Sequence, residues 1–441
     1  MNVPVPRRNS DLSASVREAH ERYAAKRPAS AALHEKARAV MPAGNTRSVL
    51  SYGPFPTAMA RGADCRLWEV DGNAYLDLCG EYTAGLFGHS NPRLHATLRE
   101  ALDRGLNLAA VGEAEMRLAR ILCDRFPSVQ KIRFTNSGTE ANLLALTAAR
   151  TLTRREQIVV FRGGYHGGVL TFPLSGRSPA TVPMPFILAD YNDIEATVAA
   201  VQQNAASIAA VIVEPMMGAG GCIPATPAFL AALRAVTREN DILLVFDEVM
   251  TSRMSAGGMQ QRLGVIPDMT TLGKYVAGGM SFGAFGGRED VMAQFAADLP
   301  HAGTFNNNVL SMAAGSVAMG EIFTADTAEA LFARGEALRA ALNAACQAAG
   351  TPMRFTGLGS MMTPHFRAGP IARPYTATPE EEALRELFFF DMLEAGLYLA
   401  RRGMVALSLP VGAPETARFV AAVAEFAQSR GPLLRAGAPL A

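Results

Sequence analysis

The sequence predicts an α/β protein with a mainly parallel central sheet in a large domain and a smaller α+β domain built from the two chain ends. Between about residues 105 and 325, short apolar runs alternate with helical stretches. The runs are mostly apolar along their whole length, which is typical of strands covered by helices on both faces. We therefore expect 1–104 to form an N-terminal segment with part of the small domain, 105–325 the large domain, and 326–441 the C-terminal small domain.

The elements follow in chain order. Residues 11–27 and 30–40 have the pattern of amphipathic helices, closed by Pro28 and Pro42. The segment "RLWEVDGNAYLDL" then alternates apolar and polar residues around an Asp-Gly pair, which predicts a hairpin. The strands expected in the large domain are "KIRFTN", "QIVVF", "FILAD", "IAAVIVEP" and "ILLVFDE". The last hundred or so residues carry long helices and a strand-like "MVALSLP".

Composition argues against several classes of partner. Lys and Arg together number 41 against 40 for Asp and Glu, so no strong field attracts nucleic acid or an anionic membrane. No stretch of about 18 apolar residues occurs, and the N-terminus has no apolar signal region. The five cysteines are scattered, without a CxxC or a nearby His at metal-ligand spacing. These features predict a cytoplasmic protein with small-molecule partners and no metal site.

Polar residues follow the predicted strands, at the edge where ligands bind in such sheets. After "KIRFTN" comes "SGTEAN", where Ser137 and Glu140 form an S-x-x-E capping box at the start of a helix. With Gly138 and Thr139, this helix N-terminus is also an anion site. A cap alone explains these residues equally well, so phosphate binding needs support from other segments.

Three further strand ends carry side chains with chemical uses. Tyr165 lies on the turn "RGGYHGG" after "QIVVF", and Asp247 ends the run "ILLVFD". A buried acid must find a cation or a hydrogen-bond donor, so Asp247 is either a structural cap or a functional carboxylate. Lys274 is the only charge in "MTTLGKYVAGGMSFGAFGG". It either reaches water or has a chemical use for a depressed pKa.

Taken together, these features match the needs of pyridoxal phosphate. A helix N-terminus holds the phosphate, an aromatic side chain stacks on the ring, and an acid keeps the ring nitrogen protonated. A lysine forms the Schiff base and then moves protons. The order and spacing of the four features therefore predict a pyridoxal phosphate enzyme with Asp247 and Lys274 as its catalytic residues.

The same segments resemble the class III aminotransferases of the fold-type I pyridoxal phosphate enzymes, from about Met41 to Pro410. "TNSGTEAN" resembles the phosphate cup, "GGYHG" the stacking turn, "LLVFDEV" the acid segment and "TTLGKYVAGGMSFGAFGG" the Schiff-base segment. The resemblance implies that Val249 packs on the ring face opposite Tyr165. It also implies a homodimer in which Thr304, in "GTFNNNVLSMAAG", reaches the phosphate of the neighbouring subunit.

The resemblance is strongest to two branches, those of glutamate-1-semialdehyde aminomutase and of aromatic β-amino-acid aminotransferases. The aminomutase branch usually reads like "GTLSGNPLAMAAG" where this chain has "GTFNNNVLSMAAG", which weakens that interpretation. "NTRSVLSYGPFP" and "EYTAGLFGHS" look closest to the β-phenylalanine enzymes. The expected reaction therefore moves the amino group of an aromatic β-amino acid to a keto acid such as 2-oxoglutarate or pyruvate.

That resemblance also implies two substrate-binding arginines. One matching Arg47 receives the substrate carboxylate, and its segment contains no acid from Pro42 to Arg61. One matching Arg402 lies beside the carboxylate of the second substrate, although the adjacent Arg401 could face inward instead. A guanidinium without a nearby acid can accept a carboxylate through two parallel hydrogen bonds.

Other functions remain as alternatives. Within the family, the chain could be an aminomutase or another amine or ω-amino-acid transaminase. A dinucleotide-dependent oxidoreductase needs G-x-G-x-x-G, but "GAGGCI" and "GLGSMM" lack the third glycine. A silent regulatory protein of the same fold would be expected to lack the lysine or to carry a DNA-binding domain. "HERYA" and "HEKAR" lack the second histidine of a metallohydrolase motif.

Overall fold

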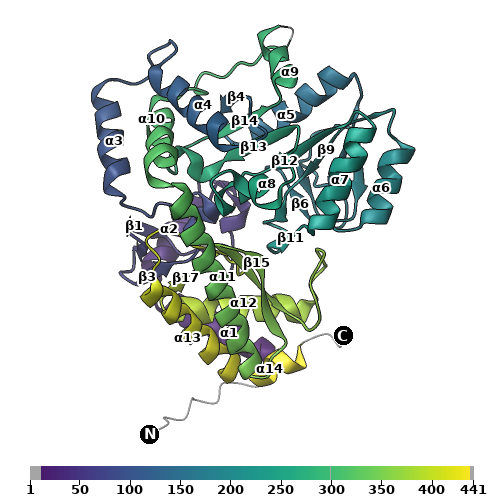
Figure 1. Cartoon of the computed structure of the whole chain (residues 1–441). Helices are drawn as coiled ribbons and strands as arrows, with labels where there is room; N and C mark the ends of the chain where they lie inside the picture. Colours follow the sequence, from purple (N-terminus) through teal and green to yellow (C-terminus); the bar gives the residue numbers. More distant parts are fainter. Residues whose placement is uncertain (1–10, 298, 438–441) are drawn as a thin grey trace.

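A central sheet of seven strands organises the large domain in the computed structural model, which describes residues 11–297 and 299–437 (Figure 1). The spatial order of the strands is β4 (Lys131–Thr135), β14 (Gly283–Gly287), β13 (Met269–Gly273), β12 (Leu243–Asp247), β9 (Ile208–Val213), β5 (Gln157–Phe161) and β8 (Phe186–Ala189). The pairings among β13, β12, β9, β5 and β8 are parallel, and only β14 runs antiparallel to its neighbours. The predicted mainly parallel sheet is confirmed.

Helices cover both faces of this sheet, which explains why its strands are apolar throughout. Successive residues of β12 illustrate this, because Val245 packs in a cluster with α5 (Gly138–Thr153) and Phe246 packs in another with α7 (Pro227–Glu239). The other helices of this region are α4 (Glu113–Arg125), α6 (Ile194–Gln203), α8 (Gly258–Leu263), α9 (Glu289–Met292) and α10 (Val309–Val317). The two short hairpins are β6 (Gly164–Tyr165) with β7 (Thr171–Phe172), and β10 (Met216–Met217) with β11 (Ile223–Pro224).

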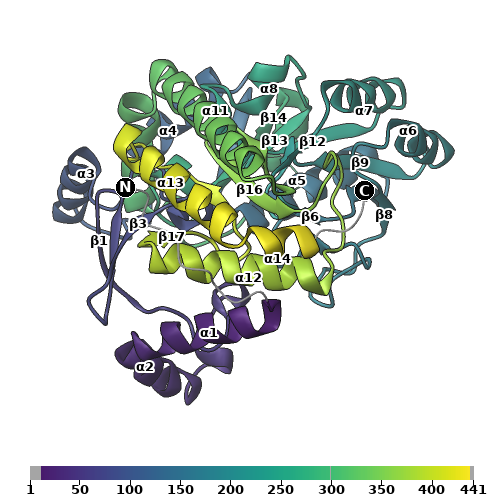
Figure 2. The ribbon, with the colours of Figure 1, turned by 90° about the horizontal axis from the view of Figure 1, so that it is seen from below.

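Both ends of the chain contribute to the smaller α+β region. One sheet joins β1 (Met59–Ala63), β2 (Arg66–Glu69) and β3 (Ala74–Asp77) to β17 (Leu397–Tyr398), and another contains β15 (Met353–Leu358), β16 (Met361–Phe366) and β18 (Val405–Ala406). The helices of this region are α1 (Leu12–Ala25), α2 (Pro28–Arg38), α11 (Ala325–Ala348), α12 (Pro379–Glu394), α13 (Ala413–Ser429) and α14 (Gly431–Ala436). The remaining helix, α3 (Pro92–Asp103), packs against α10 of the large domain (Figure 1). Figure 2 shows α11, α13 and α12 side by side, with α1 against α12.

Some local predictions are confirmed by the structure and others are only partly met. The hairpin around Asp71 and Gly72 is present, with Arg66 opposite Leu76. The strand-like "MVALSLP" contributes only Val405 and Ala406 to a sheet. We propose the domain boundaries at 104/105 and 325/326, because all seven central strands lie between α3 and α11.

The Gly-rich segment that ends in "SFGAFGG" contains β14, a strand that the sequence analysis did not assign. Glycine is needed there because neighbouring backbone comes very close. A Cβ atom added at Gly283 would lie 2.1 Å from the carbonyl oxygen of Ser137.

No helix among the described residues is long and apolar enough to cross a membrane.

A buried ion pair connects the N-terminal helices to the hairpin. Arg27, which precedes α2, donates to Glu69 Oε2 at 3.0 Å and to the Tyr75 hydroxyl at 2.6 Å. The Arg27 and Glu69 side chains are 3% and 0% exposed. Removing one partner of such a pair leaves the other charge buried without compensation.

We predict that Arg27→Ala lowers the free energy of unfolding by about 3 to 5 kcal/mol, because Glu69 loses its buried counter-charge. Urea unfolding followed by circular dichroism measures the change. Arg17→Ala, at an exposed arginine on α1, is the matched control and should change stability by less than about 0.5 kcal/mol. Equal midpoints for both variants would show that the pair does not support the fold.

Candidate active site

A cavity of about 280 Å³ opens at the carboxyl edge of the central sheet. It brings together seven of the residues that the sequence analysis selected, from four separate segments: Ser137, Gly138, Thr139, Tyr165, Asp247, Val249 and Lys274. Other lining residues are Asn136, Asn142, His166, Gly167, Glu214, Met250, Met280, Ser281 and Phe282. The carboxyl ends of parallel strands meet at one edge, so residues distant in sequence converge here.

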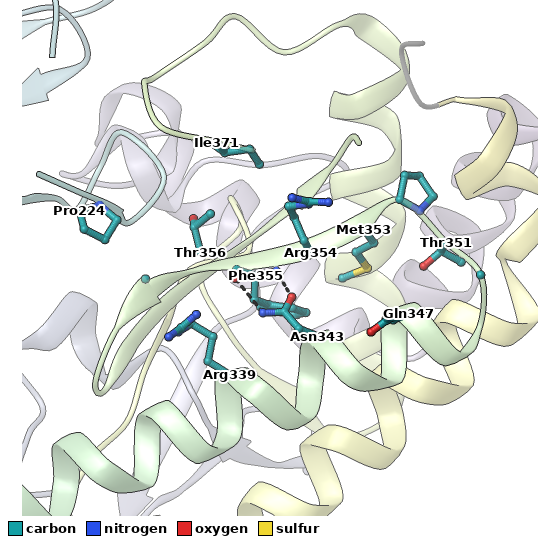
Figure 3. Close-up of a pocket in the computed structure, with 13 residues that line it drawn as sticks. Pro224, Arg339, Asn343, Gln347, Thr351, Met353, Arg354, Phe355, Thr356 and Ile371 are labelled. Carbon is teal, nitrogen blue, oxygen red and sulfur yellow. Dashed lines mark hydrogen bonds between the residues drawn. The ribbon is translucent and has the colours of Figure 1, made fainter. Parts of the chain in front are cut away.

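Cavity size alone does not identify the site. A larger hollow of about 730 Å³ lies between α11 and β15 (Figure 3). Its lining contains no lysine and no carboxylate, and its Asn343 amide pairs with the backbone N–H and C=O of Phe355. Asn343 therefore has a structural role, because it pairs with backbone groups of β15. The titratable side chains gather in the smaller cavity, so we take that cavity as the candidate active site.

Lys274 lies immediately after β13 and begins a short 3-10 turn, Lys274–Ala277. Its φ of 53° is in the left-handed region, which is a costly conformation for a residue other than glycine. Burial lowers the pKa of the Lys274 ammonium. The side chain is half-buried and lines the cavity, so an amine with a depressed pKa faces the site.

Asp247 ends β12 and is 5% exposed. Its Oδ2 accepts hydrogen bonds from Asn142 Nδ2 at 2.9 Å and pairs with His166 Nδ1 at 2.8 Å. Its Oδ1 accepts from the backbone N–H of Val249 at 3.0 Å. Thr271, on the neighbouring strand, donates to Asn142 Oδ1 at 2.6 Å and fixes the amide. A buried carboxylate is thus held at the cavity by three donors.

Two titratable side chains near Asp247, those of His166 and Glu214, have pKa values shifted from their ordinary ones. Burial lowers the pKa of His166, but the hydrogen bond to Asp247 and its charge outweigh burial, so the pKa lies above the usual histidine value. Burial raises the pKa of Glu214 to about 7. Glu214 Oε1 accepts from the backbone N–H of Tyr165 and Oε2 from that of Gly218, both at 3.0 Å.

The N-terminus of α5 also lines the cavity. The Ser137 hydroxyl accepts from the backbone N–H of Glu140 at 3.2 Å, as predicted. The Glu140 carboxylate, however, accepts from the N–H of Asn136 at 2.8 Å instead of completing a capping box at Ser137. A Cβ at Gly138 would lie 2.8 Å from Val249. The first N–H groups of α5 have no partner within the helix, and Ser137, Gly138 and Thr139 line the cavity, so this helix end is available to an anion.

Tyr165 and Val249 line the same cavity. Tyr165 is 43% exposed, and its backbone is fixed by Glu214. Val249 is buried beside Gly138 and Gly273. An aromatic side chain and a branched aliphatic one are thus available to contact a flat ring in this cavity.

Arg47 differs from the sequence-based expectation. Its segment from Pro42 to Arg61 contains no acid, but Arg47 Nη1 donates to Glu81 Oε1. Glu81 lies 34 residues away in sequence, and the fold brings it to the Arg47 segment. Both side chains are partly exposed, at 44% and 57%. The expectation of an arginine with no acidic partner was therefore wrong.

The choice between Arg401 and Arg402 can be made from their contacts. Arg401 Nη2 pairs with Glu386 at 3.0 Å. The Arg402 guanidinium lies 5.5 Å from the Tyr82 ring centroid, and the Arg47 guanidinium lies 5.2 Å from the same ring. Arg402 makes no ion pair within the described part of the chain. Arg402, and not Arg401, is therefore the arginine that lies with Arg47 at the Tyr82 ring.

Thr304 does not reach this cavity. It is exposed and lines a separate hollow of about 770 Å³, formed with Phe305 and the connection between α3 and α4. It is thus the one predicted cofactor-binding residue that lies outside the cavity of its own chain.

Sequence reasoning missed three polar groups of the site: Asn142, His166 and Glu214. Glu214 directly follows β9, so the rule of inspecting strand ends could have found it. His166 adjoins Tyr165 on the predicted turn, but nothing marked its ring as the partner of Asp247. Asn142 lies inside α5, where only the three-dimensional approach to Asp247 distinguishes it from an ordinary helical residue.

The comparisons with known proteins now give the family. Residues 49–410 match the family described as aminotransferase class-III. The chain belongs to the class III aminotransferases. It is 49% identical to a β-phenylalanine transaminase of Variovorax paradoxus, over 96% of this chain and 98% of that protein. It is 35% identical to a glutamate-1-semialdehyde 2,1-aminomutase of Methanosarcina acetivorans, over 83% of this chain and 90% of that protein.

Solved structures agree with this membership. The β-phenylalanine aminotransferase of Variovorax paradoxus superposes with a TM-score of 0.94, at 48% identity, over 96% of this chain and 98% of that one. An ω-transaminase of Sphaerobacter thermophilus gives a TM-score of 0.86 at 36% identity, over 91% and 98% of the two chains. The aminotransferase therefore has the fold-type I architecture, and it is a pyridoxal phosphate enzyme.

The residues of the cavity fit that cofactor. A helix N-terminus suits the phosphate, a buried carboxylate suits a protonated ring nitrogen, and an amine with a depressed pKa suits the aldehyde. Among the described residues, no group of His, Cys, Asp or Glu side chains is arranged to hold a metal ion.

We predict that borohydride reduction of the holoenzyme fixes the cofactor on Lys274 alone, because Lys274 is the only lysine that lines the cavity. Peptide mapping by mass spectrometry locates the adduct. Lys274→Ala should retain the cofactor without a covalent link and lose turnover. An adduct on a peptide that lacks Lys274 would contradict the assignment.

Proposed function

We propose that this aminotransferase takes the amino group of an aromatic β-amino acid of the β-phenylalanine type and passes it to a keto acid such as 2-oxoglutarate or pyruvate. The observation that carries the proposal is the pair of guanidiniums on the Tyr82 ring. The positive charges of Arg402 and Arg47 both lower the pKa of Lys274, after the larger effect of burial, so both lie within electrostatic reach of the amine. The 49% identity to a β-phenylalanine transaminase supports the same substrate class.

In this proposal, the cavity residues have separate roles toward the cofactor. Ser137, Gly138 and Thr139 hold the phosphate at the start of α5, and Tyr165 and Val249 contact opposite faces of the ring. When bound, pyridoxal phosphate supplies a carbonyl carbon for the amino group and a ring that accepts electrons.

Two of these residues move or hold protons. Asp247 keeps the ring nitrogen protonated, and its hydrogen bonds to Asn142 and His166 prevent the carboxylate from turning away. Lys274 Nζ removes the proton from the amine-bearing carbon of the substrate and returns a proton during transfer. Its depressed pKa supports this role, because a general base must be neutral near the working pH.

The position of the arginines suits a β-amino acid. Its carboxylate stands one carbon farther from the reacting amine than that of an α-amino acid, so the receiving cation must be set back from Lys274. Arg47 precedes the 3-10 turn Ser48–Leu50 and is not among the residues that line the cavity with Lys274, which suits a cation set back from the amine. Arg402 would receive the carboxylate of the keto acid, since it has no acidic partner in the described ranges.

An aminomutase function is the alternative within the family. It is supported by the 35% identity to an aminomutase over 83% of this chain. The two functions differ in one requirement, because an aminomutase turns over its substrate without an added keto acid.

The homodimer and the cytoplasmic location are also proposals. Large apolar side chains lie exposed around the hollow that contains Thr304, among them Leu108, Val111 and Phe305 at 58%, 91% and 55% exposure. Such a patch is typical of an interface between protein chains. The five cysteines form no disulfide, which suits a reducing compartment.

We predict that Arg47→Ala lowers kcat/KM for β-phenylalanine by about 30-fold or more, from the loss of a charge-assisted contact worth roughly 2 to 5 kcal/mol. Steady-state kinetics with 2-oxoglutarate measures the effect. The matched substrate is 1-phenylethylamine, which lacks the carboxylate and should be affected less than about twofold. Unchanged β-phenylalanine kinetics in the variant would rule out Arg47 as the carboxylate receptor.

We predict a dimer of two 46.8 kDa chains in which Thr304→Ala weakens cofactor retention, because Thr304 completes the phosphate site of the neighbouring subunit. Sedimentation gives the mass, and dialysis followed by absorbance gives the retained cofactor. Thr151→Ala, at an exposed threonine on α5, serves as the control. A fully active monomer would refute the shared site.

A further inference from the structure

The turn Gly80–Thr83 has an unusual backbone. Gly80, Glu81, Tyr82 and Thr83 have φ values of 52°, 45°, 53° and 84°, all in the left-handed region. Three of these residues are not glycine, so each pays a steric cost that the surrounding structure must offset. Strained backbone of this kind persists where neighbouring contacts fix it, and it gathers at ligand-binding sites.

Asp77 supplies those contacts from the end of β3. It is 4% exposed, and its Oδ1 accepts hydrogen bonds from the backbone N–H groups of Cys79 at 2.9 Å and Gly80 at 3.0 Å. Its Oδ2 pairs with His89 Nε2 at 2.9 Å. The hydrogen bond to Asp77 raises the pKa of His89, which favours the charged partner. A buried carboxylate and a histidine therefore hold the start of the turn.

The turn places two side chains against the substrate-binding arginines. The Glu81 carboxylate accepts from Arg47 Nη1, and the Tyr82 ring lies near the guanidiniums of both Arg47 and Arg402. Glu81 engages one nitrogen of the guanidinium. No hydrogen bond from Arg47 Nε or Nη2 occurs among the described residues, so that edge can still meet a carboxylate.

We propose that Glu81 is a specificity-determining residue that competes with the substrate carboxylate for Arg47, and that Asp77 is a positioning residue that acts through Glu81. This inference rests on the proposed function, because it requires Arg47 to receive a carboxylate. Glu81 neutralises the charge of Arg47 when no substrate carboxylate is bound. It thereby lowers the affinity of Arg47 for carboxylates in general. Arg47 therefore increases the affinity only of a substrate whose carboxylate reaches Nε and Nη2, the edge of the guanidinium that Glu81 does not occupy.

The first experiment uses equilibrium binding, so it does not depend on turnover. The probe is 3-phenylpropanoate, which has the ring and carboxylate of β-phenylalanine but no amine, titrated into the holoenzyme by calorimetry. Glu81→Gln should lower its Kd by about two- to fivefold, the range expected for a partly exposed ion pair. Glu35→Gln, at another exposed glutamate paired with an arginine, should leave the Kd unchanged. An unchanged or raised Kd in Glu81→Gln would overturn the competition.

The same variants separate this inference from the proposed function. Glu81→Gln should lower KM for β-phenylalanine by the same factor without changing kcat, and should leave 1-phenylethylamine kinetics unaffected. If the wild type does not turn over β-phenylalanine but Glu81→Gln still lowers the Kd for 3-phenylpropanoate, the proposed function fails and the competition between Glu81 and the carboxylate stands. If β-phenylalanine is turned over and the Kd does not fall, only the competition fails.

A double-variant cycle tests the positioning role of Asp77. Asp77→Ala should lower the Kd for 3-phenylpropanoate, because it releases the turn that holds Glu81. It should cause no further change in Kd when Glu81→Gln is already present. Asp77→Asn keeps the oxygen that accepts from the turn, so it should resemble the wild type and controls for misfolding of the alanine variant. Additive effects of Asp77→Ala and Glu81→Gln, or a wild-type Kd in a folded Asp77→Ala protein, would show that Asp77 does not act through Glu81.

Discussion

The buried carboxylate of Asp247 is the constraint on which the rest of the site depends. A charge that is 5% exposed has lost most of its hydration, so it must be compensated by fixed donors. Asn142, His166 and the N–H of Val249 provide them, and they come from α5, from the turn after β5 and from the strand end itself. Satisfying one carboxylate therefore fixes three segments around the cavity.

Much of this arrangement could be predicted from the sequence because it follows strand ends. Asp247, Lys274 and Ser137 each lie just after a run of apolar residues, and parallel strands bring their carboxyl ends to one edge. The Arg47 contact could not be predicted in this way. Its partner Glu81 lies on a left-handed turn of mostly non-glycine residues, which no propensity favours. Likewise, β14 was not predicted from its Gly-rich sequence, although Gly283 is needed there because the Ser137 carbonyl oxygen comes too close for a side chain.

The two arginines and the turn suggest how one site can serve two acids. Arg47 and Arg402 approach the same Tyr82 ring, but only Arg47 has an acidic partner within the ranges that the structure describes. A cation that already has a partner is selective, since an incoming carboxylate must improve on the existing contact. A cation without one accepts carboxylates more generally. This asymmetry is consistent with a specific β-amino-acid donor and a broader keto-acid acceptor.

The central claim is that this class III aminotransferase uses aromatic β-amino acids as donors. The most direct test incubates the purified holoenzyme with a panel of α- and β-amino acids and glutamate-1-semialdehyde, each with and without 2-oxoglutarate, and quantifies products by chromatography. The account predicts that β-phenylalanine is consumed fastest, only when 2-oxoglutarate is present, with one glutamate formed per donor. Consumption of glutamate-1-semialdehyde without any keto acid, together with unchanged β-phenylalanine, would contradict it.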